Sequence, residues 1–375
     1  MKVAMIVNSF PPRVGGLERH VDHLTQGLAK LGHEVTVVTL DSSSGRRKRG
    51  SVRVYTGKAH FPIADIISFP AWGTTKRLAK FLKQNHIDVV ATHTRFFPMS
   101  YVGMRAARRA GIPIIHTEHG SDFVASGSFA MRLASRMVDY TLGRAVMRGA
   151  SHVLGVSEEV IQFVKRLSGR NAGVFYNAIV APESESTAVH QASHLVFVGR
   201  VVEGKGWDDY LSAFAQLRDE GYPVTGALLG DGPDLDQARE MARKLGVDQL
   251  VDIRGRADSQ EVREELRGAT LVNPSVLSEG FQIVMLEAVA EGGRVVAYPV
   301  PGSRRLVAEG FPVLVATEKS VPALVSTLRQ MLENPLKPSG AEEIAKWTWE
   351  ARSEEYASTL EDVLKNARPR GMFDS

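Results

Sequence analysis

Short apolar runs alternate with longer segments of helical periodicity along most of the chain. In the first half, a helix is predicted over 17–31, and strand-like runs stand at 3–7, 34–39, 88–91, 112–117 and 153–156. Strands that alternate with helices in this way form a parallel sheet covered by helices on both faces. The first half is therefore predicted to be an α/β domain.

The same pattern pauses at 181–187, a polar stretch rich in Pro and Ser whose composition is typical of a linker. It then restarts, with strand-like runs at 195–198, 225–229, 251–253, 271–272 and 294–297. We therefore expect two domains of similar design, over 1–180 and 188–349. The last amphipathic segment, about 350–366, is predicted to form a helix that packs back on the first domain.

Composition narrows the class of protein. A length of 375 residues with 43% hydrophobic content suits two or three domains that each bury a core. No apolar run is long enough for a spanning helix, and the first residues are interpreted as a buried strand rather than a signal peptide. The absence of Cys excludes disulfides, thiolate metal sites and cysteine nucleophiles. A cytoplasmic location is the simplest expectation.

The charge balance is mildly basic, with 46 Lys and Arg against 42 Asp and Glu. A basic chain can bind nucleic acid, but these residues are too dispersed to require it, and no nucleic-acid partner is predicted. The cluster Arg46-Arg47-Lys48-Arg49 is interpreted as a solvated loop. Contact with an anionic membrane face is the alternative for it.

The stretch from Ser278 to Ala288 has the features of an anion site. Glu279 and Gly280 are expected in a loop, and a mostly buried helix is expected to begin near Gln282. A glycine loop that opens a helix directs unpaired amides and the helix dipole at one point, which favours phosphate. Glu287, inside this apolar helix, needs a partner: the hydroxyls of a ribose or a basic side chain would serve.

Glycines also follow the first predicted strand of each half. Gly15 and Gly16 precede a helix, where they allow close approach to an anion or serve ordinary turn chemistry. Arg200 and Lys205 are expected at the carboxyl edge of the second sheet, where open parallel sheets bind ligands. A guanidinium and an ammonium there match a diphosphate, although pairing with Glu203 or Asp208 is the alternative.

His119 and Asp122 follow the predicted strand 112–117 and are expected at the carboxyl end of the first sheet. A metal site made by His116, His119 and Asp122 is not favoured, because Gly120 indicates a loop rather than a helix. A His and Asp pair that orients a hydroxyl is the preferred interpretation, and no metal site is predicted.

Four motifs occur in order: Gly15-Gly16-x-Glu18, Gly32-His33-Glu34-Val35, Gly199-Arg200-x4-Lys205-Gly206 and Glu279-x7-Glu287. Together they resemble family 4 of the retaining glycosyltransferases. That family has the GT-B architecture, in which two Rossmann-like domains face each other across a cleft. The resemblance runs from about residue 1 to 300, and 347–356 resembles the closing helix of the family.

The resemblance implies roles for individual residues. Arg200 and Lys205 would hold the diphosphate of a UDP- or GDP-linked sugar, while Glu279 would contact the hexose and His119 would lie beside the sugar ring. Asp122 is a candidate for acceptor binding, and no metal or other cofactor is implied as a requirement. The donor-binding residues implied are Gly15, Gly16, Gly255, Arg256, Gly280, Phe281, Gln282, Ile283, Val284 and Glu287.

The implied reaction moves a hexose from the nucleotide diphosphate sugar to a hydroxyl of a glycolipid or polysaccharide precursor of the cell envelope. Positive groups lower the barrier because they stabilise the charge that gathers on the leaving diphosphate, typically by about 2.7–4 kcal/mol each. In this family, retention of anomeric configuration is more often explained by same-face attack than by a covalent carboxylate intermediate. Glu279 is therefore not assigned as a nucleophile.

The chain departs from the family pattern at several places. Phe281-Gln282 stands where Phe-Gly or Phe-Pro is frequent, and Arg305 stands where a glutamate is customary. Glu291 to Arg294 replaces a Cys-Gly-x-Pro sequence, and Tyr176-Asn177-Ala178 replaces Pro-Asn-Gly. These departures bear on how the sugar and the phosphates are held more than on the fold.

Two segments of the first half are candidates for the acceptor surface. The segment 60–72 is apolar for a connection, and 129–148 carries Arg132, Arg136, Arg144 and Arg148 among Met, Leu and Val. They would suit a lipid-linked acceptor at the inner face of a membrane, with the protein bound peripherally. An ordinary packed loop and helix is the alternative.

Other functions share parts of this pattern. In a nicotinamide-dependent dehydrogenase, Gly230-Asp231-Gly232 would continue to a third glycine, but Leu235 stands in its place. A sugar-nucleotide epimerase of the same architecture and a non-catalytic binding homologue remain alternatives to the transferase.

Overall fold

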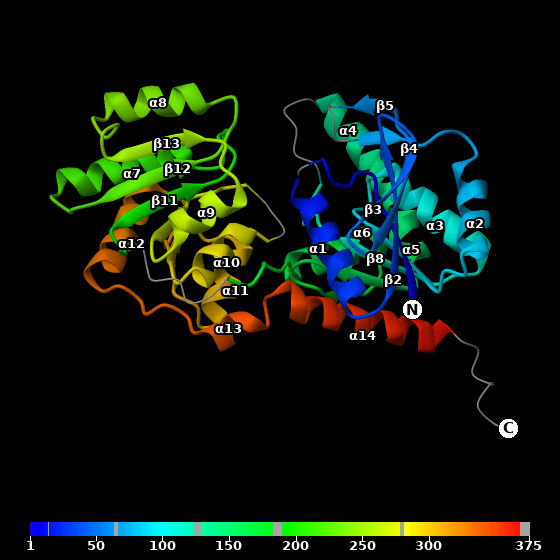
Figure 1. The fold of residues 1–375 in the computed structure, drawn as a ribbon. Helices are drawn as coiled ribbons and strands as arrows, with labels where there is room; N and C mark the ends of the chain where they lie inside the picture. Colours follow the sequence, from blue (N-terminus) through cyan, green and yellow to red (C-terminus); the bar gives the residue numbers. More distant parts are fainter. Residues whose placement is uncertain (14, 64–66, 124–128, 183–189, 278–280, 368–375) are drawn as a thin grey trace. The chain divides into compact units, whose positions relative to one another are not determined.

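The computed structural model describes residues 1–13, 15–63, 67–123, 129–182, 190–277 and 281–367. The described chain divides into two units. The first unit contains Met1–Ala178 together with the C-terminal segment from Trp349, and the second contains Ile179–Thr348. Each unit is an α/β domain built on one large sheet (Figure 1).

The sheet of the first unit has the strand order β10-β9-β8-β7-β1-β2-β4-β3. All neighbouring strands are parallel except β3 and β4. The strands are β1 (Lys2–Ile6), β2 (Glu34–Asp41), β3 (Gly45–Arg49), β4 (Val52–Lys58), β7 (Val89–His93), β8 (Ile114–Glu118), β9 (His152–Gly155) and β10 (Gly173–Val174). A separate pair is formed by β5 (His60–Ile63) and β6 (Ile67–Phe69).

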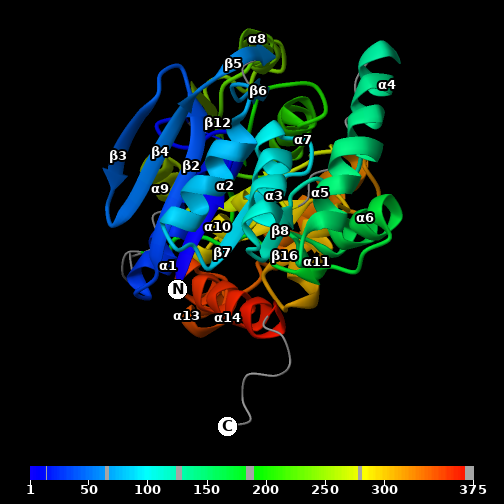
Figure 2. The same cartoon turned by 90° about the vertical axis from the view of Figure 1, so that its right-hand side faces the viewer.

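Alternating side chains of β1 enter two different cores, as the period of two in a strand requires. Val3 and Met5 join a core with α1 (Gly16–Lys30) and α14 (Trp349–Ala367), whereas Ala4 and Ile6 join a core on the other face. Helices therefore cover both faces of the sheet (Figure 2). The helices of the second face are α2 (Thr74–Gln84), α3 (Pro98–Ala110), α5 (Arg144–Gly149) and α6 (Glu158–Ser168).

The second unit has a fully parallel sheet in the order β13-β12-β11-β14-β15-β16. Its strands are β11 (His194–Val198), β12 (Thr225–Leu229), β13 (Val251–Gly255), β14 (Thr270–Asn273), β15 (Arg294–Ala297) and β16 (Val313–Val315). Its helices are α7 (Trp207–Asp219), α8 (Leu235–Lys244), α9 (Ser259–Leu266), α10 (Ile283–Ala290), α11 (Pro301–Ala308), α12 (Val321–Glu333) and α13 (Ala341–Ala345). Side chains of α7, α8 and α12 share one core with β11 and β12.

In each sheet, the order in which successive strands are added reverses at one place. In the second unit the strands follow the order 3-2-1-4-5-6, which is the Rossmann order, and the reversal lies between β11 and β14. In the first unit the reversal lies between β1 and β7. Ligands of such sheets bind beyond the carboxyl ends of the strands beside the reversal. The predicted glycine loops after β1 and β11 lie at these two places.

One sequence expectation is wrong. The basic cluster from Arg46 to Arg49 is not a loop but part of β3, which pairs antiparallel with β4 at the edge of the sheet. The backbone of β4 offers free hydrogen-bonding groups there, so a polar segment can form a strand without burying its side chains. Arg49 also forms an ion pair with Asp22 on α1, at 2.6 Å.

Among the described residues, no helix is both long enough and apolar enough to cross a lipid bilayer.

Candidate active site

Three loops lie side by side at the carboxyl ends of β11, β12 and β14 in the second unit. The amide of Val276 donates to the carbonyl of Gly204 at 2.9 Å, and the amide of Val201 donates to the carbonyl of Asp231 at 3.1 Å. Glycine is needed where the backbones approach this closely. A methyl group on Gly206 would lie 2.3 Å from the carbonyl oxygen of Pro274. The same packing explains Gly230, where a methyl group would lie 1.7 Å from the carbonyl oxygen of Gly199.

The two candidate cations belong to the first of these loops. Arg200 is exposed, and among the described residues its guanidinium forms no ion pair with Glu203 or Asp208. Lys205 is half-buried, and its amide donates to the carbonyl of Val202 at 3.2 Å, which closes a tight turn. The bond between Val276 and Gly204 brings this turn against the loop that follows β14.

The loop after β14 leads into α10, whose first two residues are Ile283 and Val284. Glu279 and Gly280 lie outside the described residues. Gln282 is the residue before the helix, and its buried amide oxygen accepts a hydrogen bond from the Asn273 side chain at the end of β14. This bond gives a physical reason for a glutamine where the family often has glycine or proline.

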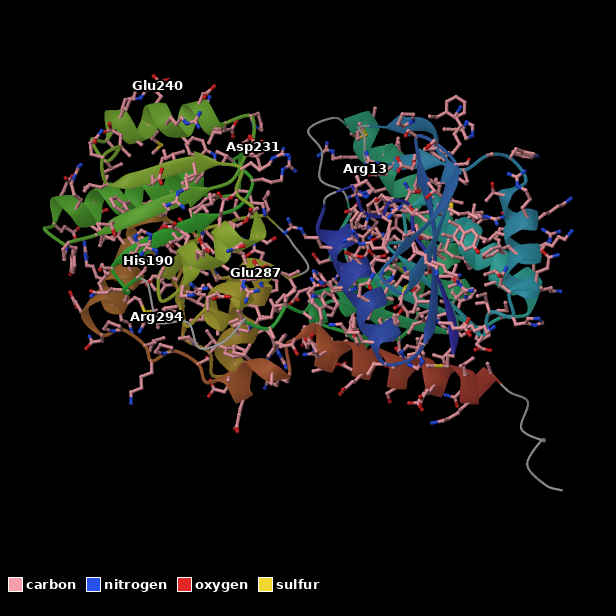
Figure 3. All side chains as sticks on the ribbon, in the orientation of Figure 1. Arg13, His190, Asp231, Glu240, Glu287 and Arg294 are labelled. Atoms are coloured by element: carbon pink, nitrogen blue, oxygen red, sulfur yellow. The ribbon has the colours of Figure 1, made fainter. Side chains whose placement is uncertain are left out.

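Two further donor-binding candidates lie on and next to α10. Phe281 is buried and stacks on Trp347, with ring centroids 5.8 Å apart. Glu287 is half-buried in the second turn of the helix (Figure 3). The first amides of a helix have no partner within the helix itself, so a helix start can bind an anion.

Gly255 and Arg256 come at the end of β13, two strands away from the reversal. Gly255 has a φ of +82°, a conformation that favours glycine. Arg256 is exposed and forms an ion pair with Asp231 at 3.2 Å. This pair links the loop after β13 to the loop after β12.

In the first unit, α1 begins at Gly16, and Gly15 precedes it in an extended conformation. The carboxylate of Glu18 folds back to accept a hydrogen bond from Ser9 in the loop after β1. A methyl group on Gly15 would lie 2.2 Å from this carboxylate. Glycine at this position therefore allows Glu18 to close the loop.

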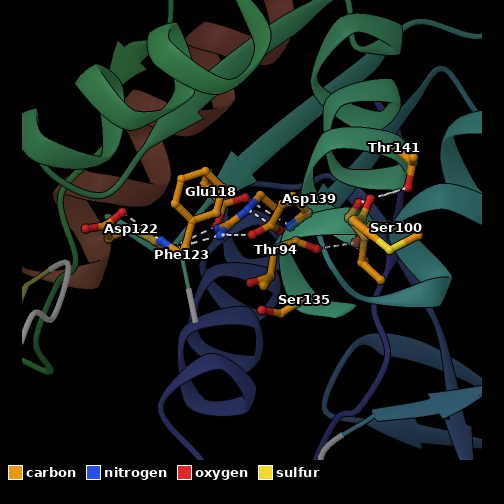
Figure 4. Close-up of polar contacts among 12 residues, drawn as sticks. Thr94, Ser100, Glu118, Asp122, Phe123, Ser135, Asp139 and Thr141 are labelled. Carbon is orange, nitrogen blue, oxygen red and sulfur yellow. Dashed lines mark hydrogen bonds and ion pairs between the residues drawn. The ribbon is translucent and has the colours of Figure 1, made fainter. Parts of the chain in front are cut away.

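The loop that carries His119 and Asp122 follows β8, and hydrogen bonds to the side chain of Glu118 hold it in place. The buried carboxylate of Glu118 accepts hydrogen bonds from the amides of His119, at 3.0 Å, and Gly120, at 2.8 Å. The guanidinium of Arg95 donates to Glu118 at 3.0 Å and to Asp139 at 2.8 Å. Figure 4 shows Glu118 and Asp139 within this polar network. Asp122 is exposed, and its carboxylate accepts from the amide of Phe123 at 2.8 Å.

The charges of this network follow from its burial and its partners. Burial raises the pKa of Glu118, but the Arg95 guanidinium, His116 and the amide of Gly120 outweigh it and lower the pKa far below its usual range. Burial also raises the pKa of Asp139, and there the same guanidinium does not outweigh it. Of these two carboxylates, we assign the ionised state to Glu118, because it accepts more hydrogen bonds.

His119 lies in a group of histidines that the sequence patterns did not identify. Its Nε2 lies 3.2 Å from Nδ1 of His93, and its ring is 4.7 Å from that of His20. Burial lowers the pKa of His119 to about 4, so the ring is neutral at neutral pH. Burial likewise lowers the pKa values of His20 and His93. These residues come from separate segments, so only the strand order reveals that they meet.

The structure does not assemble the metal set of His116, His119 and Asp122. The ring of His116 contacts Thr92 at 2.9 Å and Glu118 at 3.5 Å, beneath the loop. Asp122 instead accepts a hydrogen bond from the amide of Phe123.

Family comparisons agree with the fold. The model described as Glycosyltransferase Family 4 matches residues 14–181, and that described as Glycosyl transferases group 1 matches residues 183–352. Two consecutive matches on two Rossmann-like units define a glycosyltransferase of the GT-B class. The chain belongs to glycosyltransferase family 4, which confirms the family and the fold class expected from the motifs.

Named relatives and solved structures give the same class. One of the subunits of phosphatidylinositol N-acetylglucosaminyltransferase from Arabidopsis thaliana is 26% identical over 357 residues, covering 90% of this chain and 78% of the relative. Alpha-monoglucosyldiacylglycerol synthase of Streptococcus pneumoniae is 25% identical, covering 82% of this chain and 74% of the relative. The structure of HepE from Anabaena, in complex with UDP and glucose, has a TM-score of 0.71 at 19% identity and covers 96% of this chain and 100% of that one.

Proposed function

We propose that this glycosyltransferase moves a hexose from a UDP- or GDP-linked sugar to a hydroxyl of a glycolipid or polysaccharide precursor, with retention of the anomeric configuration. The observation that carries the proposal is the packing of the loops after β11 and β14 at the reversal of the second sheet. This packing brings the turn of Lys205 against the loop that leads to the start of α10.

The proposed reaction needs a stabilised leaving group. The bond between the anomeric carbon and the phosphate oxygen breaks, and the acceptor oxygen bonds to the same face of that carbon while its proton passes to the leaving phosphate. Arg200, Lys205 and the first amides of α10, at Ile283 and Val284, would hold the negative charge of the diphosphate. Glu287 would accept hydrogen bonds from the ribose hydroxyls.

The remaining roles are proposed by the same logic. A neutral His119 beside the sugar can exchange hydrogen bonds with a hydroxyl without adding a positive charge to an oxocarbenium-like sugar. Glu279 and Gly280 are proposed to contact the hexose, and Gly15 and Gly16 the diphosphate. Gly255 and Arg256 are proposed to lie at the base, with Phe281 and Gln282 supporting the sugar loop. Asp122 is retained as a candidate for the acceptor.

The relatives support a UDP-linked donor and a lipid acceptor. The HepE structure contains UDP and glucose, and the names of both relatives describe transfer of sugars to lipids. A UDP-linked hexose is therefore the first donor to test, with GDP-linked hexoses as the comparison.

A peripheral membrane location is proposed from α4 (Phe129–Val138), which has no buried residue. Phe129, Leu133 and Met137 are each more than half exposed and recur every four residues, so they form one stripe. Arg132 and Arg136 are also exposed on this helix. An apolar stripe beside cations fits the interface of an anionic membrane. On this proposal the protein acts at the inner, cytoplasmic face.

The central test is replacement of the proposed donor ligands. Lys205→Ala should lower kcat/KM by about 100-fold to 1000-fold, as loss of one group that stabilises developing charge does. Glu287→Ala should lower kcat/KM through weaker binding of the donor, because it removes the acceptor for the ribose hydroxyls. They should also reduce the rise in thermal midpoint that UDP-linked hexoses produce, because only ligands that bind the native state raise it. Circular dichroism should show an unchanged fold, and EDTA should have little effect on transfer.

Lys244→Ala is the matched control, since this exposed lysine lies on α8 and forms a surface ion pair with Glu240. It should keep both the activity and the thermal response. If Lys205→Ala and Glu287→Ala both turned over at the rate of the unmodified enzyme, the proposed donor site would be wrong.

A further inference from the structure

Three histidines from distant segments meet in the first unit. His20 lies on α1, His93 is the last residue of β7, and His119 follows β8. One ring nitrogen from each lies within 4.8 Å of one from each of the others. Because β7 lies between β1 and β8 in the sheet, the three rings converge beside the reversal of strand order.

One of these rings has a polar atom without a partner. His20 is 2% exposed, yet its Nε2 has no hydrogen-bond partner among the described residues. Buried polar atoms are nearly always paired, so an unpaired one calls for an explanation such as an ion. If these side chains only filled space in the core, apolar side chains would do so without the free-energy cost of a buried unpaired polar atom.

A second residue orients His20. Its Nδ1 lies 3.0 Å from the amide oxygen of Asn177, which fixes the proton on Nδ1 and leaves a lone pair on Nε2. Histidines that bind metals usually donate their other ring N–H to an acceptor in this way. Asn177 therefore supplies the supporting contact expected of a metal site.

The spacing of the other two rings also suits a metal. Nδ1 of His93 and Nε2 of His119 are 3.2 Å apart. Two nitrogens bound to one tetrahedral Zn²⁺ at about 2.05 Å would be separated by about 3.3 Å. His119 is half-buried, whereas the other two are buried, so the group is reached from the side of His119.

We propose that His20, His93 and His119 form a binding site for Zn²⁺ with a fourth position open to water or a small ligand. Three imidazoles with one open position are a known zinc arrangement, and imidazole nitrogens favour Zn²⁺ over Mg²⁺ and Ca²⁺, which prefer oxygen ligands. This site shares His119 with the proposed sugar transfer, so the test below measures Zn²⁺ binding rather than transfer activity.

A second histidine group, in the second unit, provides a contrast. His190 and His194 lie near Glu265, and their rings stack face to face with centroids 4.0 Å apart. Glu265 is already occupied by Arg254 at 2.7 Å and by His194 at 2.6 Å. Variants of this second histidine group therefore serve as a control for Zn²⁺ binding to the first.

The test is isothermal titration of the full chain with Zn²⁺, after treatment with EDTA and dialysis. One equivalent should bind tightly, and His93→Gln or His119→Gln should weaken the affinity by at least about 100-fold. Asn177→Ala should weaken it by about 10-fold to 100-fold, as loss of a supporting contact typically does. The double variant His190→Gln, His194→Gln should bind like the unmodified chain.

Thermal unfolding gives a check that does not depend on a buried substitution. Zn²⁺ should raise the midpoint of the unmodified chain but not that of His119→Gln, whose half-buried ring can be replaced without a large cavity. The proposal is overturned if the EDTA-treated chain binds no stoichiometric Zn²⁺. It is equally overturned if binding is lost in the His190→Gln, His194→Gln variant and kept in His119→Gln.

Discussion

Gly206 and Gly221 show how the surroundings of a residue decide the effect of one added methyl group. Both have a positive φ, of +82° and +87°. No atom lies within 4 Å of the place a Cβ would take on Gly221, whereas on Gly206 it would lie 2.3 Å from the carbonyl oxygen of Pro274. The two positions therefore share backbone strain but differ in crowding.

Gly221→Ala is expected to destabilise the second unit by about 1–2 kcal/mol, the cost of a left-handed conformation for an L-residue. Gly206→Ala should lower the thermal midpoint clearly more, because the loops after β11 and β14 must separate. It should also abolish the stabilisation by a UDP-linked hexose, which Gly221→Ala should retain. Equal midpoints and equal ligand responses in the two variants would contradict this account of the loop packing.

The buried contact between Arg95 and Asp139 leads to a second prediction at the scale of residues. Both side chains are 1% exposed, so Asp139→Ala removes one of the two carboxylates that compensate a buried guanidinium. Breaking a buried ion pair in this way typically costs about 3–5 kcal/mol. Urea unfolding of the first unit should show a loss of this size. Asp236→Ala, which removes an exposed pair with Arg239, should change stability little, and a similar loss in both variants would count against the prediction.

The sequence could predict the loop residues of the candidate site but not the histidine group. Gly15, Arg200 and Lys205 stand within two residues of the start of a helix or the end of a strand, so local patterns suffice to place them at a sheet edge. His20 and His93 carry no such local signal. Their contact with His119 depends on β7 pairing with both β1 and β8, which is a property of the strand order.

At the scale of elements, β3 and α4 show that an exposed element is harder to interpret from its sequence pattern than a buried one. All five residues of β3 are exposed, so no apolar alternation marks it as a strand, and its pairing with β4 comes from the backbone. In α4 an apolar stripe is present, but it is not buried. Periodicity predicts that a helix forms and which side is apolar, but it does not predict what that side contacts.

The exposed stripe of α4 predicts binding to anionic vesicles. The double variant Phe129→Ser, Met137→Ser should float poorly with such vesicles because it removes apolar area that would enter the interface. Arg132→Gln combined with Arg136→Gln should weaken binding mainly at low salt, since screening already reduces the attraction at high salt.

Matched controls for this experiment lie in the second unit. Leu250 is an exposed apolar residue, and Arg239 is a half-exposed arginine on α8. Leu250→Ser and Arg239→Gln should float like the unmodified chain. If the chain does not bind anionic vesicles at all, or if the control variants lose binding as much as the α4 variants, the membrane proposal is wrong.

At the scale of the whole molecule, alternation of strands and helices was enough to predict two parallel α/β domains, and the structure and the family comparison confirm them. Core strands such as β12 and β15 begin and end where the apolar runs do, because both of their faces are covered. The first unit is completed only by α14, whose Tyr356 and Leu360 enter the same core as α1.

This discontinuous first unit leads to a prediction about where instability spreads. Leu360 and Leu217 are both fully buried, on α14 and α7 respectively. Replacing either with Ala should cost about 2–5 kcal/mol. Hydrogen exchange followed by mass spectrometry should show faster exchange in β1, β2 and α1 for Leu360→Ala, although these segments lie more than three hundred residues earlier in the chain. For Leu217→Ala, the faster exchange should appear in β11 and β12 instead. If Leu360→Ala accelerated exchange in β11 and β12 but left β1 and α1 unchanged, α14 would not belong to the core of the first unit.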